Sequence, residues 1–296
     1  MGYSPNPSGA STTPALLGTS PAMRKVAEAV ARGAAHGLPV LVCGEPGSGR
    51  EMVARAIHER RWGRNAPFVK LDCSHSADAA IDLFGVPSHD GRRNDRRLPE
   101  PITRQCRLYE SLGGTAYVEN LWRLPHRLQV RLVRLLHDGE AIIADDHERV
   151  EFDTQLVVVV DTSTREDGRL ESELWQPLLK NRIDLPPLRE RREDIPALTA
   201  FFVEESCRRA NLPVKALSQP ARELLGALPW YGNAGELKML VDGLVARVRS
   251  TTITLADILA NVQLEGRVRP FMTLRTLRDA RARFEREYIT VEGGRG

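Results

Sequence analysis

The residues best suited to chemistry lie in one glycine-rich segment, GEPGSGRE, at residues 44–51. Closely spaced glycines let the backbone curl, so that successive N–H groups and the start of a helix can face one anion. The spacing G-x-x-x-x-G is that of a Walker A loop, in which a following lysine reaches the β- and γ-phosphates of a nucleotide. We therefore predict a nucleotide site formed by Gly44, Glu45, Pro46, Gly47, Ser48, Gly49, Arg50 and Glu51.

Two positions depart from the general loop pattern. Arg50 stands in the place of the lysine. It keeps the positive charge, but its side chain is bulkier and planar, so the exchange is not conservative. Glu51 stands where a serine or threonine would normally reach a magnesium ion. The alternative interpretation is a glycine-rich turn between a strand and a helix that binds no ligand.

The elements around this segment indicate how it is positioned. Residues 39–43 (PVLVC) are a short apolar run of the length and β-branching typical of a buried strand. Strands that alternate with helices indicate an α/β fold, here a P-loop parallel sheet flanked by helices. The other predicted strands are residues 68–71, 115–118 and 156–160, and helical periodicity is found at residues 51–59 and 124–137.

The pattern changes after residue 187, where strand-like runs stop and only helical periods follow. These periods, at residues 194–210, 219–228 and 234–249, predict a small all-helical domain. The expected division is a disordered leader at 1–15, an α/β nucleotide-binding domain at 16–189, a helical lid domain at 190–262, and a linker with a terminal helix at 263–296.

Composition excludes some classes of protein. The net charge is +3, so the charge of the whole chain does not indicate a nucleic-acid partner. The four cysteines are widely spaced and form no CxxC pair, which argues against a disulfide framework or a zinc site. No apolar run approaches the ~20 residues that span a bilayer, and the start of the chain has no signal-peptide pattern. We expect a cytoplasmic protein with no membrane partner.

Several short motifs occur in order along residues 16–262. With them, the chain resembles the AAA+ domain of the sigma-54-dependent transcriptional activators, also called bacterial enhancer-binding proteins. The resemblance implies a sheet domain with a helical lid, a ring of subunits with nucleotide between neighbours, and glutamate as the ordinary residue at position 51. The motifs are LLGTSPAM (16–23), GEPGSGRE, MVARAIH (52–58), APFVKLDC (66–73), DLFG (82–85), GGT (113–115), LPPLRERREDIP (185–196) and WYGNAGEL (230–237).

Residues that this family uses for hydrolysis are replaced. Glu119 and Asn120 stand where its Walker B motif has Asp-Glu, the pair that holds magnesium and polarises the attacking water. Glu119 could still hold magnesium through one extra methylene, whereas Asn120 cannot accept a proton. Asp161 follows the fourth predicted strand, where the family has a polar sensor that is usually asparagine.

Three arginine positions of the family are also lost. Glu171 and Pro177 occupy the places of two arginine fingers, which neutralise charge on the transferred phosphoryl group and can be worth ~10³–10⁵ in rate. Gly235 stands where the lid supplies its sensing arginine. Together with Asn120, these replacements predict a pseudo-ATPase that binds ATP or ADP, with Mg²⁺ at Glu119 as a further candidate ligand.

The segment that contacts the sigma factor is different as well. The family carries GAFTGA after Leu-Phe-Gly, whereas residues 83–85 here lead into VPSHDGRRNDRRLPEPITRQC at 86–106. This segment is interpreted as a solvated surface loop or as an arginine-rich arm for phosphates or acids. The chain stops before the helix-turn-helix unit that the family carries next, so direct DNA binding is not expected. The candidate partners are a related AAA+ subunit or RNA polymerase with its sigma factor.

Three functions are open at this point. The first is a transcription-regulatory AAA+ module that binds nucleotide, with hydrolysis weak or lost. The second is an active ATPase with unorthodox catalytic residues, such as Arg50 and Asp161. The third is a scaffold that binds another protein and no nucleotide. The loop glycines favour the first function over the third, and the lost catalytic positions disfavour the second.

Overall fold

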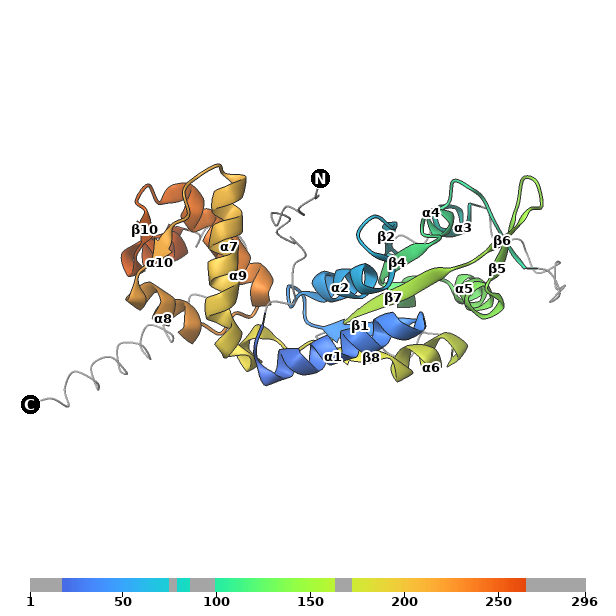
Figure 1. The fold of residues 1–296 in the computed structure, drawn as a ribbon, viewed down its shortest axis with the longest axis horizontal. Coiled ribbons are helices and arrows are strands. Elements are labelled where there is room, and N and C mark those ends of the chain that lie inside the picture. The colour runs from blue at the N-terminus through green and yellow to red at the C-terminus, as the bar shows by residue number, and fades with distance from the viewer. Residues whose placement is uncertain (1–17, 75–78, 86–98, 163–171, 265–296) are drawn as a thin grey trace, which may run out of the picture.

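Short runs rich in β-branched residues form a central sheet in the computed structural model, which describes residues 18–74, 79–85, 99–162 and 172–264. All neighbouring strands of this sheet are parallel, so the α/β prediction is confirmed. The sheet occupies one end of the molecule and a group of helices the other (Figure 1). In spatial order the strands are β2 (Phe68–Asp72), β4 (Gly114–Glu119), β7 (Thr154–Asp161), β1 (Val40–Gly44) and β8 (Arg182–Asp184).

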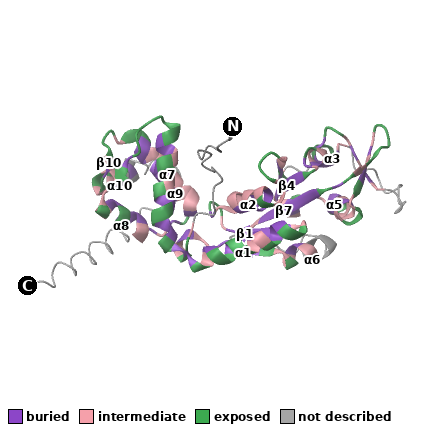
Figure 2. Cartoon of the chain, viewed as in Figure 1, coloured by how far each residue is buried: buried purple, intermediate pink, exposed green. Residues whose placement is uncertain are grey.

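Both faces of this sheet are covered by helices, and its strands form a buried layer between them (Figure 2). Successive residues of a strand point to opposite faces. In β1, Leu41 and Cys43 pack with α3 to α6, whereas Val40 and Val42 pack with α1 and α2. The helices are α1 (Pro21–His36), α2 (Arg50–Trp62), α3 (Ala79–Phe84), α4 (Arg107–Glu110), α5 (His126–Asp138) and α6 (Ser172–Lys180).

A second, three-stranded sheet lies at the far end of this domain (Figure 1). Sequence patterns did not reveal it, because its strands have only three or four residues each and lack a clear period. One of them lies within the segment at 86–106, which is therefore not a loop throughout, although residues 86–98 are outside the described residues. The strands are β3 (Glu100–Ile102), β5 (Glu140–Ile143) and β6 (Arg149–Glu151), in the order β3-β5-β6.

The remaining helices have a core of their own, separate from the two layers beside the sheet. Trp230 is buried there, and its indole N–H donates to Leu225 O at 2.8 Å. The prediction that strands stop after residue 187 is wrong in detail, because two two-residue strands, β9 (Ala216–Leu217) and β10 (Thr252–Ile253), pair within this lobe. The helices are α7 (Ile195–Arg209), α8 (Gln219–Ala227), α9 (Asn233–Arg247) and α10 (Leu255–Leu264). We call them, with β9 and β10, the helical lobe.

Two 3₁₀ turns, Leu188–Glu190 and Arg192–Asp194, connect the sheet domain to the helical lobe. Asp194 is fully buried and accepts hydrogen bonds from Thr19 N (2.8 Å), Ser20 N (2.9 Å) and Ser20 Oγ (2.7 Å). The same Ser20 side chain caps the start of α1. The connection therefore fixes the beginning of the chain's first helix to the entry of the helical lobe.

The described part of the chain contains neither a candidate membrane span nor a disulfide. Among its helices, none is long and apolar enough to cross a bilayer. Cys43, Cys73, Cys106 and Cys207 are all buried and none forms a disulfide. The leader at 1–15 and the terminal helix at 274–288 lie outside the described residues and stay predictions.

Replacing Asp194 by alanine is expected to destabilise the fold by about 3 kcal/mol, because three donors lose their acceptor and two of those bonds are buried. Urea unfolding at pH 7 measures the change. Asp184→Ala is the matched control: that carboxylate is exposed and, among the described residues, pairs only with nearby Arg182, so its loss is expected to change stability by no more than about 1 kcal/mol. Equal effects of the two substitutions would contradict the role given to Asp194.

Candidate phosphate-binding site

The predicted phosphate loop joins the end of β1 to the start of α2. Gly47 (φ 73°) and Gly49 (φ 107°) both have the left-handed backbone that favours glycine, and Gly49 immediately precedes α2. A Cβ atom on Gly47 would lie 2.2 Å from Gly232 O, so no larger residue fits there without displacing the helical lobe. The local geometry is that of a strand, a tight glycine turn and a helix N-terminus.

Two polar side chains of this loop have no hydrogen-bond partner among the described residues. Arg50 is half-buried and, among the described residues, makes no hydrogen bond or ion pair. The charge of Arg50 also acts on Tyr117 in β4. Burial raises the pKa of Tyr117, and the nearby Arg50 works against that rise. Ser48 is 2 % exposed, and its Oγ has no hydrogen-bond partner. A free cation beside a helix N-terminus suits an anionic ligand.

Glu51 is engaged within the protein. Its carboxylate accepts hydrogen bonds from Lys70 Nζ at 2.6 Å and Arg55 Nε at 2.9 Å. Burial by itself would raise the pKa of Glu51, but these two partners outweigh it and lower that pKa. Glu51 therefore joins α2 to β2 as an ionised carboxylate.

The acidic residues singled out in the sequence lie at the same edge of the sheet as the loop. Asp161 ends β7 and is paired in register with Gly44, the last residue of β1. Glu119 ends the adjacent strand β4 and accepts a hydrogen bond from Tyr117 Oη at 3.2 Å. The carboxyl ends of parallel strands are the usual location of ligands in open α/β sheets. The fold thus brings Glu119 and Asp161 toward the phosphate loop.

The side chain of Asn120 turns away from the phosphate loop, toward the end of β2. It has a left-handed backbone (φ 57°), and its amide nitrogen donates to Asp72 Oδ1 and Ser74 Oγ, both at 2.7 Å. Those partners follow β2, whereas the loop follows β1, two strands away from β4 in the sheet. The side chain that stands in the place of a general base is therefore held by neighbours at the end of β2.

The three lost arginine positions have different locations. Glu171 lies outside the described residues. Pro177 lies inside α6 and is partly buried. Gly235 is in the first turn of α9, and its backbone N–H donates to Gly47 O at 3.1 Å. Position 235 is therefore next to the loop, and it carries no side chain.

The loop has further partners that sequence reasoning missed. Arg189 donates two hydrogen bonds to the Glu45 carboxylate, at 2.8 and 2.6 Å, and Asn233 Nδ2 donates to the same group at 3.1 Å. Hydrogen bonding to Arg189 lowers the pKa of Glu45, against the opposing effect of burial. Arg189 lies in the motif LPPLRERREDIP and Asn233 in the motif WYGNAGEL, so the sequence did single out both segments. It could not indicate their contact with Glu45, which is more than 140 residues away in the chain.

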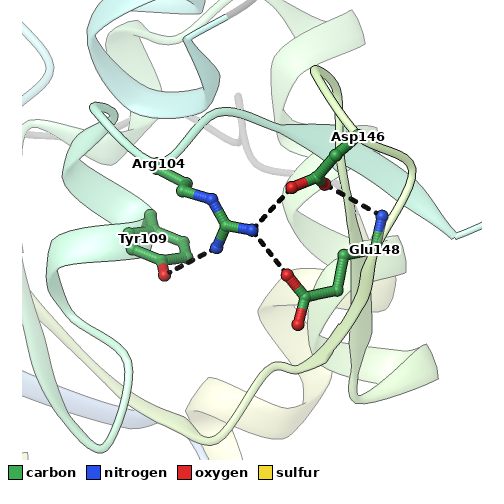
Figure 3. A network of polar contacts seen from close by, with 4 residues as sticks. All are labelled: Arg104, Tyr109, Asp146 and Glu148. Carbon is green, nitrogen blue, oxygen red and sulfur yellow. Dashed lines mark hydrogen bonds and ion pairs between the residues drawn. The ribbon is translucent and has the colours of Figure 1, made fainter.

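A separate polar cluster lies at the second sheet. Arg104 Nη2 donates to Asp146 Oδ2 (2.7 Å) and Glu148 Oε2 (2.5 Å), and its Nη1 donates to Tyr109 Oη (3.2 Å). Figure 3 shows the guanidinium between the tyrosine of α4 and the two acids of the β5–β6 turn. This arginine of the segment at 86–106 thus binds acids of its own chain. The described residues contain no group of three or more His, Cys, Asp or Glu side chains that could hold a metal ion.

The chain is similar in sequence to known proteins. The family model for the sigma-54 interaction domain matches residues 16–183, and the model for the AAA+ ATPase lid domain matches residues 189–270. NtrC of Azospirillum brasilense is 33% identical over 238 residues, which cover 78% of this chain and 48% of that protein. ZraR of Klebsiella oxytoca is 31% identical over 232 residues, which cover 77% and 51%. The chain spans about half the length of these relatives.

Solved structures show the same fold. NtrX from Brucella abortus in complex with ADP superposes with a TM-score of 0.69 at 26% identity, covering 94% of this chain and 63% of that chain. The structure of NtrX in complex with ATP gives the same TM-score and identity, covering 95% and 64%.

The Glu45–Arg189 pair is expected to make stability depend on pH. Because the pKa of Glu45 is lowered from 4.5 in the folded state, the pair's contribution is complete above about pH 4.5 and is lost as the pH falls through the lowered value. We expect wild type to lose more stability than Glu45→Gln when the pH falls from 7 to 3.5, as measured by urea unfolding. Other carboxylates titrate alike in both proteins, so parallel losses would contradict the prediction.

Proposed function

The chain belongs to the sigma-54 interaction domain family of AAA+ proteins, and from this we propose that it is a transcription-regulatory module that binds ATP or ADP but hydrolyses it weakly or not at all. The observation that carries the proposal is a phosphate loop that keeps its glycine geometry and its cation beside a sheet edge where Asn120 stands in the place of the general base. Binding and chemistry depend on different groups, so one can persist without the other.

Nucleotide binding is supported by the fit of the loop to phosphate. The glycine backbone and the first turn of α2 supply N–H groups, and Arg50 supplies a positive charge that forms no ion pair in the described part of the chain. These groups would hold the phosphates. The related NtrX structures in complex with ADP and with ATP support the same proposal.

Magnesium would be held less well than in a Walker site with serine or threonine. Glu51 is committed to Lys70 and Arg55, which leaves Glu119 as the candidate ligand among the loop and strand-end residues. Bound through the nucleotide phosphates, the ion would neutralise charge on them. This chain's own contribution would be one carboxylate at the end of β4.

Weak hydrolysis is supported by the groups around the loop. The Asn120 amide donates its hydrogens and cannot accept a proton from an attacking water. Gly235 and Pro177 present no charge to a phosphate. A missing arginine finger alone removes ~4–7 kcal/mol of transition-state stabilisation, the equivalent of the ~10³–10⁵ rate effect.

The second candidate function is an active ATPase with unorthodox residues. It is favoured by one observation, the register pairing of Asp161 with Gly44, which places a carboxylate beside the loop. The scaffold without nucleotide is disfavoured, because a protein-binding role gives no reason for a half-buried Arg50 without a partner. We further propose that an intact AAA+ relative supplies the missing fingers in a mixed ring, which would act on RNA polymerase and its sigma factor.

Calorimetry and phosphate release test the nucleotide proposal. ADP and ATP are expected to bind the purified chain, with turnover near background in the presence of magnesium. Arg50→Ala is expected to weaken binding by about tenfold or more, since a charge-assisted hydrogen bond to phosphate contributes about 1.5–3 kcal/mol. Arg60→Ala, an exposed arginine in the last turn of the same helix, is the matched control and should bind as wild type does. Turnover at the rate of an intact activator would show the proposal to be wrong.

Assembly gives a second test. In a ring, a neighbour's fingers would reach the γ-phosphate, and neither Glu171 nor Pro177 can make that contact. We expect this chain alone to be a monomer or small oligomer with and without ATP and magnesium, as measured by light scattering. An intact relative added to it should shift the mass upward. A nucleotide-dependent hexamer or heptamer of this chain alone would contradict the expectation.

A further inference from the structure

The helical lobe contacts the phosphate loop through three consecutive backbone carbonyls. Pro46 O accepts from Asn233 Nδ2 at 3.0 Å, Gly47 O from the backbone N–H of Gly235 at 3.1 Å, and Ser48 O from Arg191 Nη2 at 2.7 Å. All three donors belong to the helical lobe or to the 3₁₀ turns that lead into it. The backbone carbonyls of residues 46, 47 and 48 are therefore all bound on the side of the loop that faces the lobe.

These bonds also determine where the loop's N–H groups point. The peptide unit is planar and trans, so its C=O and its N–H point in opposite directions. When the carbonyls of Pro46, Gly47 and Ser48 are held toward the lobe, the N–H groups of the following residues are directed away from it. Of these, the Ser48 N–H closes the turn on Glu45 O at 3.2 Å. The N–H groups of Gly47 and Gly49 are thus left pointing away from the lobe.

The three donors are themselves held in place. Asn233 is fully buried in a left-handed conformation (φ 59°), and its Oδ1 accepts from Leu188 N at 2.8 Å. Arg191 is only 3 % exposed, and a buried guanidinium requires acceptors. The close approach also depends on glycine at 235, because a Cβ there would lie 3.3 Å from Gly47 Cα. The lobe therefore presents a rigid set of donors to the loop.

We propose that the helical lobe preorganises the phosphate loop from outside, with Asn233, Arg191 and the Gly235 N–H as positioning groups for nucleotide binding. The inference rests on the proposed nucleotide function. Its consequence is regulatory: a partner that displaces the helical lobe releases these carbonyls, frees the loop's peptide units to rotate, and lowers the affinity for nucleotide.

The test uses the full chain with Asn233→Gly, which keeps the left-handed backbone and removes the side-chain donor. ADP affinity is expected to fall about tenfold, the equivalent of one or two lost hydrogen bonds. In the nucleotide-free protein, amide hydrogen exchange over residues 46–50 is expected to become faster. Lys215→Met is the matched control, because Lys215 Nζ binds Val248 O and Ser250 O within the lobe, away from the loop. It should leave loop exchange and ADP affinity unchanged.

Arg189→Ala provides a second variant in case Asn233→Gly does not fold, since Arg189 is partly exposed and its loss removes the bidentate pair with Glu45. It is also expected to weaken ADP binding and to speed exchange in the loop. Wild-type affinity and exchange in both variants would overturn the inference, as would an equal loss in Lys215→Met. Failure of wild type to bind ADP would refute the proposed function instead, and the exchange measurements would then decide the inference alone.

Discussion

The buried guanidinium of Arg191 is the contact on which the site depends. Burial lowers the pKa of Arg191, and the neighbouring Asp194 carboxylate works against that effect. Such a group is stable only with acceptors, and its two acceptors come from distant parts of the chain. Its Nη2 donates to Ser48 O in the phosphate loop and its Nη1 to Met23 Sδ in α1, and Asp194 binds the start of α1. Sheet domain, first helix and helical lobe are joined at this point.

The same junction explains how the phosphate loop is held in place. The loop's outward carbonyls bind the helical lobe, and Glu45 binds Arg189. None of these bonds involves Asn120, Asp161 or Pro177. The support of the loop therefore does not depend on these three side chains. Gly235 is different, because its backbone N–H donates to Gly47 O and a Cβ there would lie 3.3 Å from Gly47 Cα.

Two carboxylates next to the phosphate loop form ion pairs within the protein. Glu51 is neutralised by Lys70 and Arg55, and Glu45 by Arg189, so these carboxylates act as internal links. Arg50 forms no ion pair within the described residues, so its charge can act on a ligand beside the loop. Glu45 and Glu51 are thus paired, and Arg50 is the group offered to a ligand.

Sequence alone determined the parts of this protein that depend on local patterns. Alternating β-branched runs and helical periods gave the parallel sheet and the helical lobe, because burial selects side chains at spacings of two and of 3.6 residues. The glycines of the loop predicted its backbone, since Gly47 and Gly49 need a left-handed conformation. Tertiary structure decided the rest. The short strands β3, β5 and β6 are stable only because they pair with one another, and Asn120 turns to Asp72 because β2 lies beside β4. The bonds from Arg189 and Asn233 to Glu45 join residues far apart in the chain, and only the packing of the helical lobe on the sheet domain brings them together.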